Sequence, residues 1–482
     1  MFKNNLRELT SDSFVYGLTG LLSRSIGFLL IPVYTRMLSP EDYGVMSVVG
    51  TTAQIISIIL MLGLPGAVQR FYFDHDARQN RRFLGSIVLF QNGLGLAACL
   101  AIIAFAPQIS GAIYKRTDFA LFLTLSMIQV WLTLVSMAPG ILMVNRRQKW
   151  LNLAITGSGT LISAAVPLYL VLVKKMGVSG VFLGSVYAQA LLWLVYGWLT
   201  LKEMDWVIEW RYVKTALAFS LPLVPHLLSH WVLNFIDRIM LQRMAGLEQT
   251  GLYSLGYNFG LIMMLAVGSV NTAYAPWFYR QNNQDQEVAI KLVGRMITYY
   301  LLAIGLLFLG VASFSREAIE LVADIRFFRA YPVVPVVALG YVFQGLYFMA
   351  VAPLFHFKKT AWLPFLSIAA ALVNIVLNLW LIPRWGMMGA AWATVGGLAV
   401  LFCGVGYVSS RLYPVKLEWR RIAIIILAAG ITFLLLWPLN NYRLLVSIPL
   451  KVLAFLAVPV VMWMAGFFSS DEKEWIKTKI KT

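Results

Sequence analysis

The chain has 482 residues, of which 60% are hydrophobic and only 12% are charged, whereas a soluble domain is roughly half apolar and a quarter charged. This composition excludes a protein that exposes its whole surface to water. The net charge of +18 arises from 39 Lys and Arg against 21 Asp and Glu. These cations lie in short clusters between apolar runs, which favours a lipid bilayer over nucleic acid as the partner.

Fourteen apolar runs follow one another along the chain. Each is long enough to cross a bilayer as a helix, which takes roughly 20 residues. The first run, residues 13–36, is too long for a signal-peptide core and has no small-x-small cleavage site, so we expect it to be a retained span. The expected spans begin near Ser13, Asp42, Arg82, Asp118, Trp150, Ser179, Tyr212, Glu248, Glu287, Ala330, Ala361, Met387, Arg420 and Leu445. The predicted fold class is an all-α polytopic membrane protein without a soluble domain.

The uneven distribution of cations between the loops predicts the orientation of the chain. If the N-terminus lies in the cytoplasm, Lys and Arg are more frequent in the cytoplasmic loops and the C-terminal tail than in the outer loops. This distribution follows the positive-inside rule. We therefore expect both termini on the cytoplasmic side.

Two pairs of similar segments reveal an internal repeat. RMLSPEDYGVMS at residues 36–47 recurs as RMAGLEQTGLYS at residues 243–254, with Arg, Met, Glu, Gly and Ser in the same places. The two glycines of KKMGVSG, residues 174–180, recur in RWGMMG, residues 384–389, at nearly the same offset. Such a constant offset indicates two related halves.

The repeat predicts three parts. Residues 1–206 and 207–412 each form a six-helix lobe, and residues 413–482 add two transmembrane helices and a basic cytoplasmic tail. Because each half has an even number of spans, both insert the same way up, as parallel repeats. Transporters built in this way bind their substrate between the halves.

Two stretches carry a resemblance to a known family. The first runs from Gly27 through Pro32, Tyr34 and Arg36 to Tyr43 and Gly44, and the second contains Asp237, Arg238, Leu241, Glu248, Gly251 and Tyr253. Together with the two-half plan, they resemble the polysaccharide transporter family, the O-antigen and exopolysaccharide flippases of the MATE-like MOP superfamily. The resemblance spans nearly the whole chain and is diffuse after Ser410.

The resemblance implies a function. Members of this family are thought to flip an undecaprenyl-pyrophosphate-linked oligosaccharide from the inner to the outer leaflet of the bacterial inner membrane. By resemblance we expect a MATE-like fold, membrane lipids as surroundings and a polysaccharide polymerase as a partner to consider. We expect a monomer, no nucleic acid partner, and no cofactor apart from a coupling Na+ or H+.

Arg24 lies near the middle of the first span, where it should face protein or water rather than lipid. It shares one helical stripe with Ser13, Gly17, Gly20 and Gly27. One interpretation is a cavity wall whose guanidinium binds a pyrophosphate through paired hydrogen bonds. The other is a glycine-rich packing seam in which Arg24 bonds to a neighbouring helix.

The seventh span carries titratable groups. His226, His230 and Asp237 fall on one helical face, after Pro222 and Pro225, which should kink or unwind the helix. This face predicts a line that couples proton or cation entry to lobe movement. Alternatively, the histidines satisfy neighbouring helices, and Asp237 and the adjacent Arg238 form a clamp at the outer mouth.

The remaining candidates for substrate binding are a cation and several amides. Arg70 closes the second span at the cytoplasmic mouth, where it either guides the head group or anchors the helix to the interface. Intramembrane amides have the chemistry to meet sugar hydroxyls, although bonding between helices is their commoner role. The amides chosen are Gln91, Asn92, Asn234 and Asn258.

Two other function classes compete with a flippase. A cation-coupled multidrug or small-molecule exporter of the MATE type is expected to hold an acidic residue in its N-terminal half, and no span interior of the first half has one. A membrane-embedded polysaccharide polymerase or ligase usually carries a long catalytic loop, and none is present. Only Cys99 and Cys403 occur, both in apolar runs, so neither a disulfide nor a metal site is expected.

Overall fold

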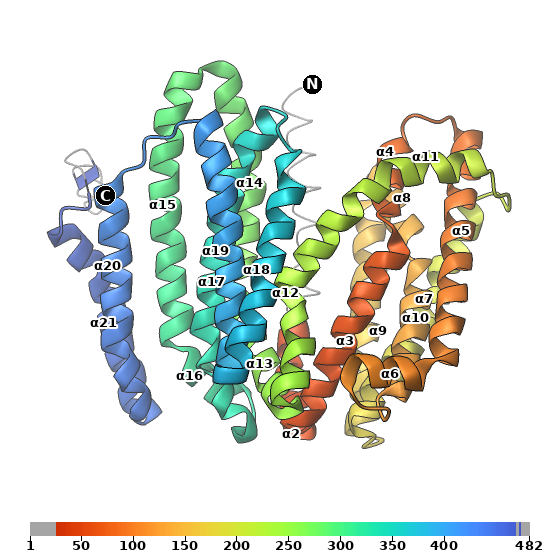
Figure 1. Cartoon of the computed structure of the whole chain (residues 1–482), viewed down its shortest axis with the longest axis horizontal. Coiled ribbons are helices and arrows are strands. Elements are labelled where there is room, and N and C mark those ends of the chain that lie inside the picture. Colours follow the sequence, from red (N-terminus) through yellow and green to blue (C-terminus); the bar gives the residue numbers. More distant parts are fainter. Residues whose placement is uncertain (1–25, 469–471, 474–482) are drawn as a thin grey trace. The chain divides into compact units, whose positions relative to one another are not determined.

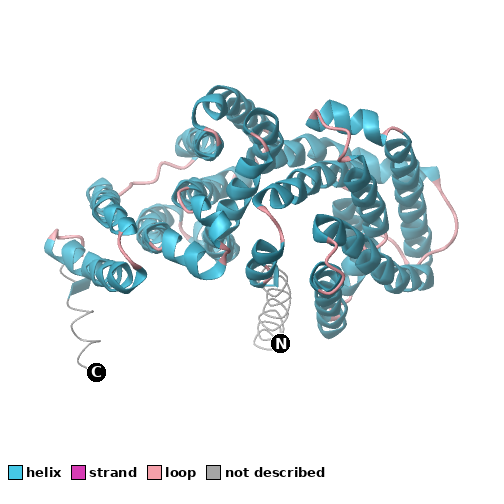
Figure 2. Ribbon diagram, turned by 90° about the horizontal axis from the view of Figure 1, so that it is seen from below, coloured by secondary structure: helices cyan, strands magenta, loops and turns pink. Residues whose placement is uncertain are grey.

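The computed structural model describes residues 26–468 and 472–473. Every regular element in this part of the chain is a helix (Figure 2). Among the described residues, 13 helices are long and apolar enough to cross a membrane. The predicted all-α polytopic fold is therefore confirmed. The first predicted span, residues 13–36, falls largely outside the described residues, and its described end contains α2 (Ile31–Met37).

The chain packs as two compact units, Met1–Gly251 and Leu252–Thr482 (Figure 1). Because α12 packs against α3, the first unit extends beyond residue 206, where the sequence repeat divides the chain. The repeat boundary stays a prediction. After α2, unit 1 contains α3 (Pro40–Met61), α4 (Leu64–Phe71), α5 (Ala77–Ala104), α6 (Ala106–Tyr114), α7 (Ala120–Leu134), α8 (Met137–Asn145), α9 (Lys149–Leu172), α10 (Gly177–Glu203), α11 (Trp210–Ser220), η1 (Leu221–Leu223) and α12 (Val224–Ala245).

The first repeated segment forms a tight helix crossing in unit 1. Ser39 begins α3 with a capping box, in which the side chains of Ser39 and Asp42 each bond to the other's backbone N–H. The repeated glycines, Gly44 and Gly251, lie where α3 meets the start of α13 (Leu247–Gly260). A Cβ on Gly251 would collide with the carbonyl oxygen of Pro40. The repeat therefore preserves a close backbone approach.

The second repeated pair of glycines makes the same turn twice. Gly177 begins α10 with φ +56°, and Gly386 precedes α19 with φ +54°. Three residues further on, a Cβ on Gly180 would press on the backbone of Leu170, and one on Gly389 would collide with the backbone of Leu381. The sequence repeat thus corresponds to a structural one, in α9–α10 and in α18–α19.

The seventh span is broken, as its prolines predict. The helix α11 ends at Ser220, a 3-10 turn covers Leu221–Leu223, and α12 then runs in a different direction (Figure 1). Pro222 and Pro225 lie at this break. The break meets that between α3 and α4, where Gly63 has φ +69° and approaches the carbonyl of Ser220.

Unit 2 is centred on α17, which packs against α14, α15 and α19. The helices α20 and α21 lie at one side of this unit, beyond α15, and are its least buried spans (Figure 1). The helices that follow α13 are α14 (Ile262–Gln284), α15 (Gln286–Ser313), α16 (Ser315–Val322), η2 (Ile325–Ala330), α17 (Val333–His356), α18 (Trp362–Trp385), α19 (Met387–Leu412), α20 (Trp419–Leu436), η3 (Trp437–Asn441) and α21 (Leu444–Met464).

Candidate functional site

A ladder of polar side chains follows one face of α12. The amide nitrogen of Asn234 lies 2.8 Å from the carbonyl oxygen of His230 and 3.1 Å from its ring Nδ1. One turn later, Arg238 donates to the carbonyl oxygen of Asn234 at 2.7 Å and to Asp237 Oδ1 at 3.1 Å. We call His226, His230, Asn234, Asp237 and Arg238 the α12 ladder.

Burial increases along the α12 ladder. His226, one turn before His230, is partly exposed, whereas Asp237 and Arg238 are only 1% and 5% exposed. A buried carboxylate and guanidinium in contact neutralise each other's charge. Asn234 joins the histidines to this ion pair, which the sequence analysis missed when it treated Asn234 as a separate amide. The spacing of four residues through 226, 230, 234 and 238 was the available signal.

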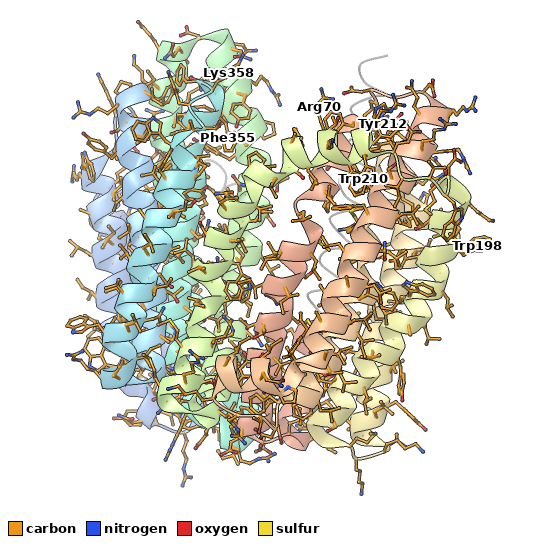
Figure 3. The ribbon with its side chains drawn as sticks, turned by 45° about the vertical axis from the view of Figure 1, so that its right-hand side comes forward. Arg70, Trp198, Trp210, Tyr212, Phe355 and Lys358 are labelled. Carbon is orange, nitrogen blue, oxygen red and sulfur yellow. The ribbon has the colours of Figure 1, made fainter. Side chains whose placement is uncertain are left out.

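Of the two arginines predicted to bind substrate, only Arg70 lies among the described residues. Arg24 lies outside the described residues, so its surroundings stay a prediction. Arg70, in the last turn of α4, is exposed and forms an ion pair with Asp74 at 2.7 Å. Figure 3 shows Arg70 at the same end of unit 1 as Trp210 and Tyr212.

Other cations at this end of unit 1 are also paired. Arg146 donates to both carboxylate oxygens of Glu203, each at 2.7 Å, and its hydrogen bonds to Glu203 and Tyr72 raise the pKa of Arg146 above its ordinary value. Arg81 contacts Asp205 at 3.0 Å. These carboxylates balance much of the local charge, so an anionic head group would compete with them here.

The amides chosen for sugar contacts do not form one group. Gln91 in α5 is fully buried, and neither of its amide atoms has a hydrogen-bond partner in the described part of the chain. Its neighbour Asn92 donates to the carbonyl oxygen of Val88 at 2.9 Å and lines an apolar cavity of about 410 Å³. Asn258 is partly exposed and belongs to unit 2. The three amides therefore differ in burial and hydrogen bonding, although Gln91 and Asn92 are neighbours in α5.

A second set of buried amides lies in unit 2. Asn374 donates to the carbonyl oxygen of Ala393 at 3.1 Å, and Asn378 donates to the carbonyl and the side-chain oxygen of Asn374 at 3.0 and 3.1 Å. The side-chain oxygen of Asn378 has no hydrogen-bond partner among the described residues. Carboxamide and carbonyl oxygens are ligands that hard cations accept, although no group of three His, Cys, Asp or Glu in the described ranges could hold a metal.

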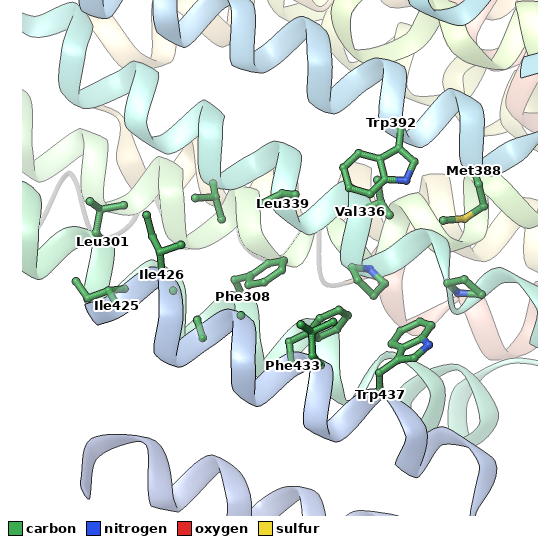
Figure 4. A pocket seen from close by; sticks show the side chains of 17 residues that line it. Leu301, Phe308, Val336, Leu339, Met388, Trp392, Ile425, Ile426, Phe433 and Trp437 are labelled. Carbon is green, nitrogen blue, oxygen red and sulfur yellow. The ribbon is translucent and has the colours of Figure 1, made fainter. Parts of the chain in front are cut away.

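An apolar cavity of about 620 Å³ lies between four helices of unit 2 (Figure 4). Its polar surface is small, because nearly all of its lining consists of aliphatic and aromatic side chains. They include Leu301 and Phe308 of α15, Val336 and Leu339 of α17, Trp392 of α19, and Ile426, Phe433 and Leu434 of α20, with Trp437 of η3.

A further cavity of about 430 Å³ lies along three of these helices, α15, α17 and α19, and is not lined by α20. Its lining includes Val293 and Ile297 of α15, Leu346, Met349, Ala350 and Pro353 of α17, and Phe402, Cys403, Gly406, Tyr407, Ser409 and Ser410 of α19. We call the two cavities together the α15 groove. The α15 residues that line the two cavities run from Val293 to Phe308, about 22 Å at 1.5 Å per residue, which is most of the thickness of the hydrocarbon core.

The sequence analysis did not identify the α15 groove. The residues that line it are aliphatic and aromatic, as in any span that faces lipid, so composition gives no signal. The groove depends instead on where α20 packs, which is a tertiary feature. Gly430 of α20 lines the first cavity, and a Cβ there would meet open space. A single glycine in a span does not by itself indicate a cavity.

A comparison with protein families places this geometry in context. A family model described as "Polysaccharide biosynthesis protein" matches residues 9–282 of the chain. The chain is 21% identical over 426 residues to a protein of Haloferax volcanii named "Probable low-salt glycan biosynthesis flippase Agl15", and the match covers 86% of each chain.

Two solved structures share the fold. The lipid II flippase MurJ in an inward closed conformation is 13% identical, with a TM-score of 0.76 over 94% of this chain and 99% of that chain. An inward-facing multidrug resistance MATE family transporter of the MOP superfamily is also 13% identical, with a TM-score of 0.59 over 83% of this chain and 95% of that chain. At such low identity these similarities establish the fold alone.

Proposed function

Since this chain belongs to the polysaccharide biosynthesis protein family, a family of transporters in the MOP superfamily, we propose that it is a lipid-linked glycan flippase. Its substrate is an undecaprenyl-pyrophosphate-linked oligosaccharide, which it moves from the inner to the outer leaflet by alternating access. The two related halves supply the two lobes that such a mechanism requires. The family supports a transporter rather than an enzyme.

The α15 groove is the observation that best supports a lipid-linked substrate. The larger of the two cavities has almost no polar surface, which suits an apolar lipid tail better than a water-soluble substrate. A polyprenyl chain gains roughly 0.8 kcal/mol for each CH₂ that leaves water, but a chain already in lipid gains mainly from shape complementarity with the groove walls. The groove therefore selects a tail by shape, in agreement with a branched, unsaturated polyprenyl chain.

The polar groups divide the remaining tasks. Arg24 binds the pyrophosphate, Arg70 and the amides Asn92 and Asn258 meet the head group, and the α12 ladder, which contains Asn234, couples the lobe movement to a Na+ or H+ gradient. Gln91 is fully buried and is not assigned a head-group contact. The α12 ladder fits coupling because it joins partly exposed histidines to a buried ion pair through hydrogen bonds.

The proposed location follows from the same assignment. The chain is a multi-pass membrane protein, and we place it as a monomer in the bacterial inner membrane with both termini in the cytoplasm. Its product appears on the outer leaflet, where a polysaccharide polymerase is the partner that consumes it.

Deleting the protein from its own cell tests this proposal. We expect lipid-linked oligosaccharide to accumulate on the cytoplasmic leaflet, where a membrane-impermeant glycosidase in the periplasm does not reach it. The wild-type protein supplied in trans should restore access. Unchanged glycan export in the deletion strain, together with increased sensitivity to cationic drugs, would instead favour the multidrug exporter. Continued export with loss of polymer length would favour a polymerase.

A further inference from the structure

A buried polar cluster joins α21 to the end of α15. Lys451 of α21 is fully buried, and its Nζ donates to both carboxylate oxygens of Glu317 at 2.6 and 2.8 Å. It also donates to the carbonyl oxygen of Ser313, the last residue of α15, at 2.7 Å and to Asn440 Oδ1 at 2.6 Å. We call Ser313, Glu317, Asn440 and Lys451 the Lys451 cluster.

Stability alone does not explain the Lys451 cluster. A lysine at the centre of a membrane helix costs roughly 2.5–3.5 kcal/mol on insertion scales, and an apolar pair of similar volume often stabilises a fold as well as a buried ion pair does. However, hydrogen bonds are directional, so the ammonium fixes where its acceptors lie. The ammonium of Lys451 therefore fixes where Ser313, Glu317 and Asn440 lie relative to α21.

Further polar atoms around the cluster have no protein partner. Within the described ranges, hydrogen-bond partners are lacking for the hydroxyls of Ser313, Ser315 and Ser447, for Nδ2 of Asn440 and for Nε of Arg316. Buried polar atoms are normally satisfied by protein or by ordered water. The cluster thus fits a small hydrated site inside unit 2, unlike the dry apolar seams around it.

The Lys451 cluster is connected directly to one end of the α15 groove. Asn440 belongs to η3, the same short helix as Trp437, which lines the groove. The neighbouring Arg316 donates to the carbonyl oxygen of Tyr442, just beyond η3, at 2.5 Å. Two polar contacts therefore hold the hairpin between α20 and α21 against α15 and α16.

Between its two ends, α20 packs on α15 and α21 through residues such as Ile425 and Phe433. On its other side, Ile426, Gly430 and Leu434 line the cavity, and Figure 4 shows Ile426 there. A wall that lines a void lacks some of the dispersion contacts that hold a helix in place. At its other end, α20 is tied by Arg421, which contacts Glu472 at 2.8 Å. The polar contacts at both ends therefore add to the packing that positions α20.

We propose that Lys451 is a positioning residue for substrate selection: it holds η3 and Trp437 at the end of the α15 groove and thereby sets how much of a polyprenyl tail the groove accepts. This inference rests on the proposed function, since it assigns the groove to the tail. Lys451 touches no substrate and acts through Asn440. Without it, the α20 end moves and the groove no longer discriminates between tails of different length.

The first test measures the position of α20 without any ligand. Spin labels replace the exposed residues Leu435 on α20 and Trp385 on α18, in full-length protein with Cys99→Ala and Cys403→Ala. The variants Lys451→Arg and the neutral double variant Lys451→Met with Glu317→Gln are compared with the parent. We expect one narrow distance in the parent and in Lys451→Arg, and a shifted or broadened distance in the double variant.

The second test measures tail selection. The same proteins bind polyprenyl phosphates of C55 and C20 chain length in detergent, followed by native mass spectrometry. We expect the double variant to lose roughly tenfold in its preference for C55, which corresponds to about 1.4 kcal/mol. The parent preference should remain in Lys451→Arg and in Arg146→Met, which removes an ion-paired cation far along the chain in unit 1.

The outcomes separate this inference from the proposed function. A folded double variant with the parent's distance and the parent's C55 preference overturns the role of Lys451. Equal binding of C55 and C20 by the parent itself overturns the assignment of the groove to the tail, while the distance measurement still decides whether Lys451 positions α20. The double variant should fold, because it leaves no unpaired charge, and thermal melting verifies this.

Discussion

At the scale of single residues, the cations within the predicted spans are the groups that most need partners. A cation at the centre of the hydrocarbon needs a partner, because its desolvation is not otherwise compensated. Lys451 donates to four oxygen acceptors, and the acceptors of Arg238 include Asn234 and Asp237. Arg24 lies outside the described residues, so its partner has to be found by function.

Removing the guanidinium of Arg24 should abolish transport without preventing insertion. We expect Arg24→Ala to reduce flipping at least tenfold, since a paired charge-assisted contact to pyrophosphate is lost. Arg24→Lys should keep partial activity, because the charge remains without the forked geometry. The measurement is accumulation of lipid-linked oligosaccharide on the cytoplasmic leaflet at equal protein levels. Normal export by the Arg24→Ala variant would show that Arg24 does not bind the pyrophosphate.

The histidines of the α12 ladder should control the pH dependence of transport. An imidazole titrates near pH 6.5 in water, so its charge changes in the range where a proton gradient acts. We expect the substitutions His226→Ala and His230→Ala to flatten the transport rate between about pH 5.5 and 7.5. The control is His75→Ala, in the loop between α4 and α5. The same pH profile in both ladder variants would rule out the relay.

At the scale of helices, the predictable features were those determined by local backbone chemistry. Pro222 and Pro225 predicted the break before α12, since proline removes a donor and clashes with the preceding turn. The recurring glycines at 177 and 386, which the sequence showed as part of a repeat, both have positive φ in the structure. By contrast, the α15 groove and the Lys451 cluster arise from contacts between residues more than a hundred positions apart. No local pattern encodes such contacts.

Filling the α15 groove should block lipid-linked substrates. Gly430→Leu adds a side chain into open space, so the helix should form at least as well as before. We expect binding of C55 polyprenyl phosphate to weaken by roughly tenfold, or about 1.4 kcal/mol. Gly157→Leu is the matched control, because a Cβ there also meets open space but does not line the groove. Equal binding by both variants would contradict the assignment.

The crossing of α3 and α13 should depend on glycine. In Gly251→Val the new side chain would press on the carbonyl oxygen of Pro40, so the helices must separate. We expect a loss of about 1–3 kcal/mol in stability, as for other overpacked sites, measured as a lower melting temperature in detergent. Gly157→Val serves for comparison, since it removes a helical glycine without a collision. A similar melting temperature for both would show that the close approach is dispensable.

At the scale of the whole molecule, composition and the lengths of the apolar runs were sufficient to predict an all-helical protein with many spans, because the bilayer restricts a chain to helices of nearly fixed length. The division by packing, Met1–Gly251 and Leu252–Thr482, differs from the repeat boundary near residue 206. The reason is that α11 and α12 pack on helices of the first half. By packing, the α12 ladder belongs to unit 1, although the sequence repeat assigns its residues to the second half.

Transbilayer movement in a purified system tests the central claim most directly. The wild-type protein is reconstituted into liposomes with a fluorescent undecaprenyl-pyrophosphate oligosaccharide, and an external glycosidase reports the fraction accessible from outside. The account predicts that wild-type protein makes the protected inner-leaflet pool accessible, whereas Arg24→Ala and protein-free liposomes do not. Wild-type liposomes that protect this pool as well as protein-free ones, under both imposed Na+ and H+ gradients, would contradict the account.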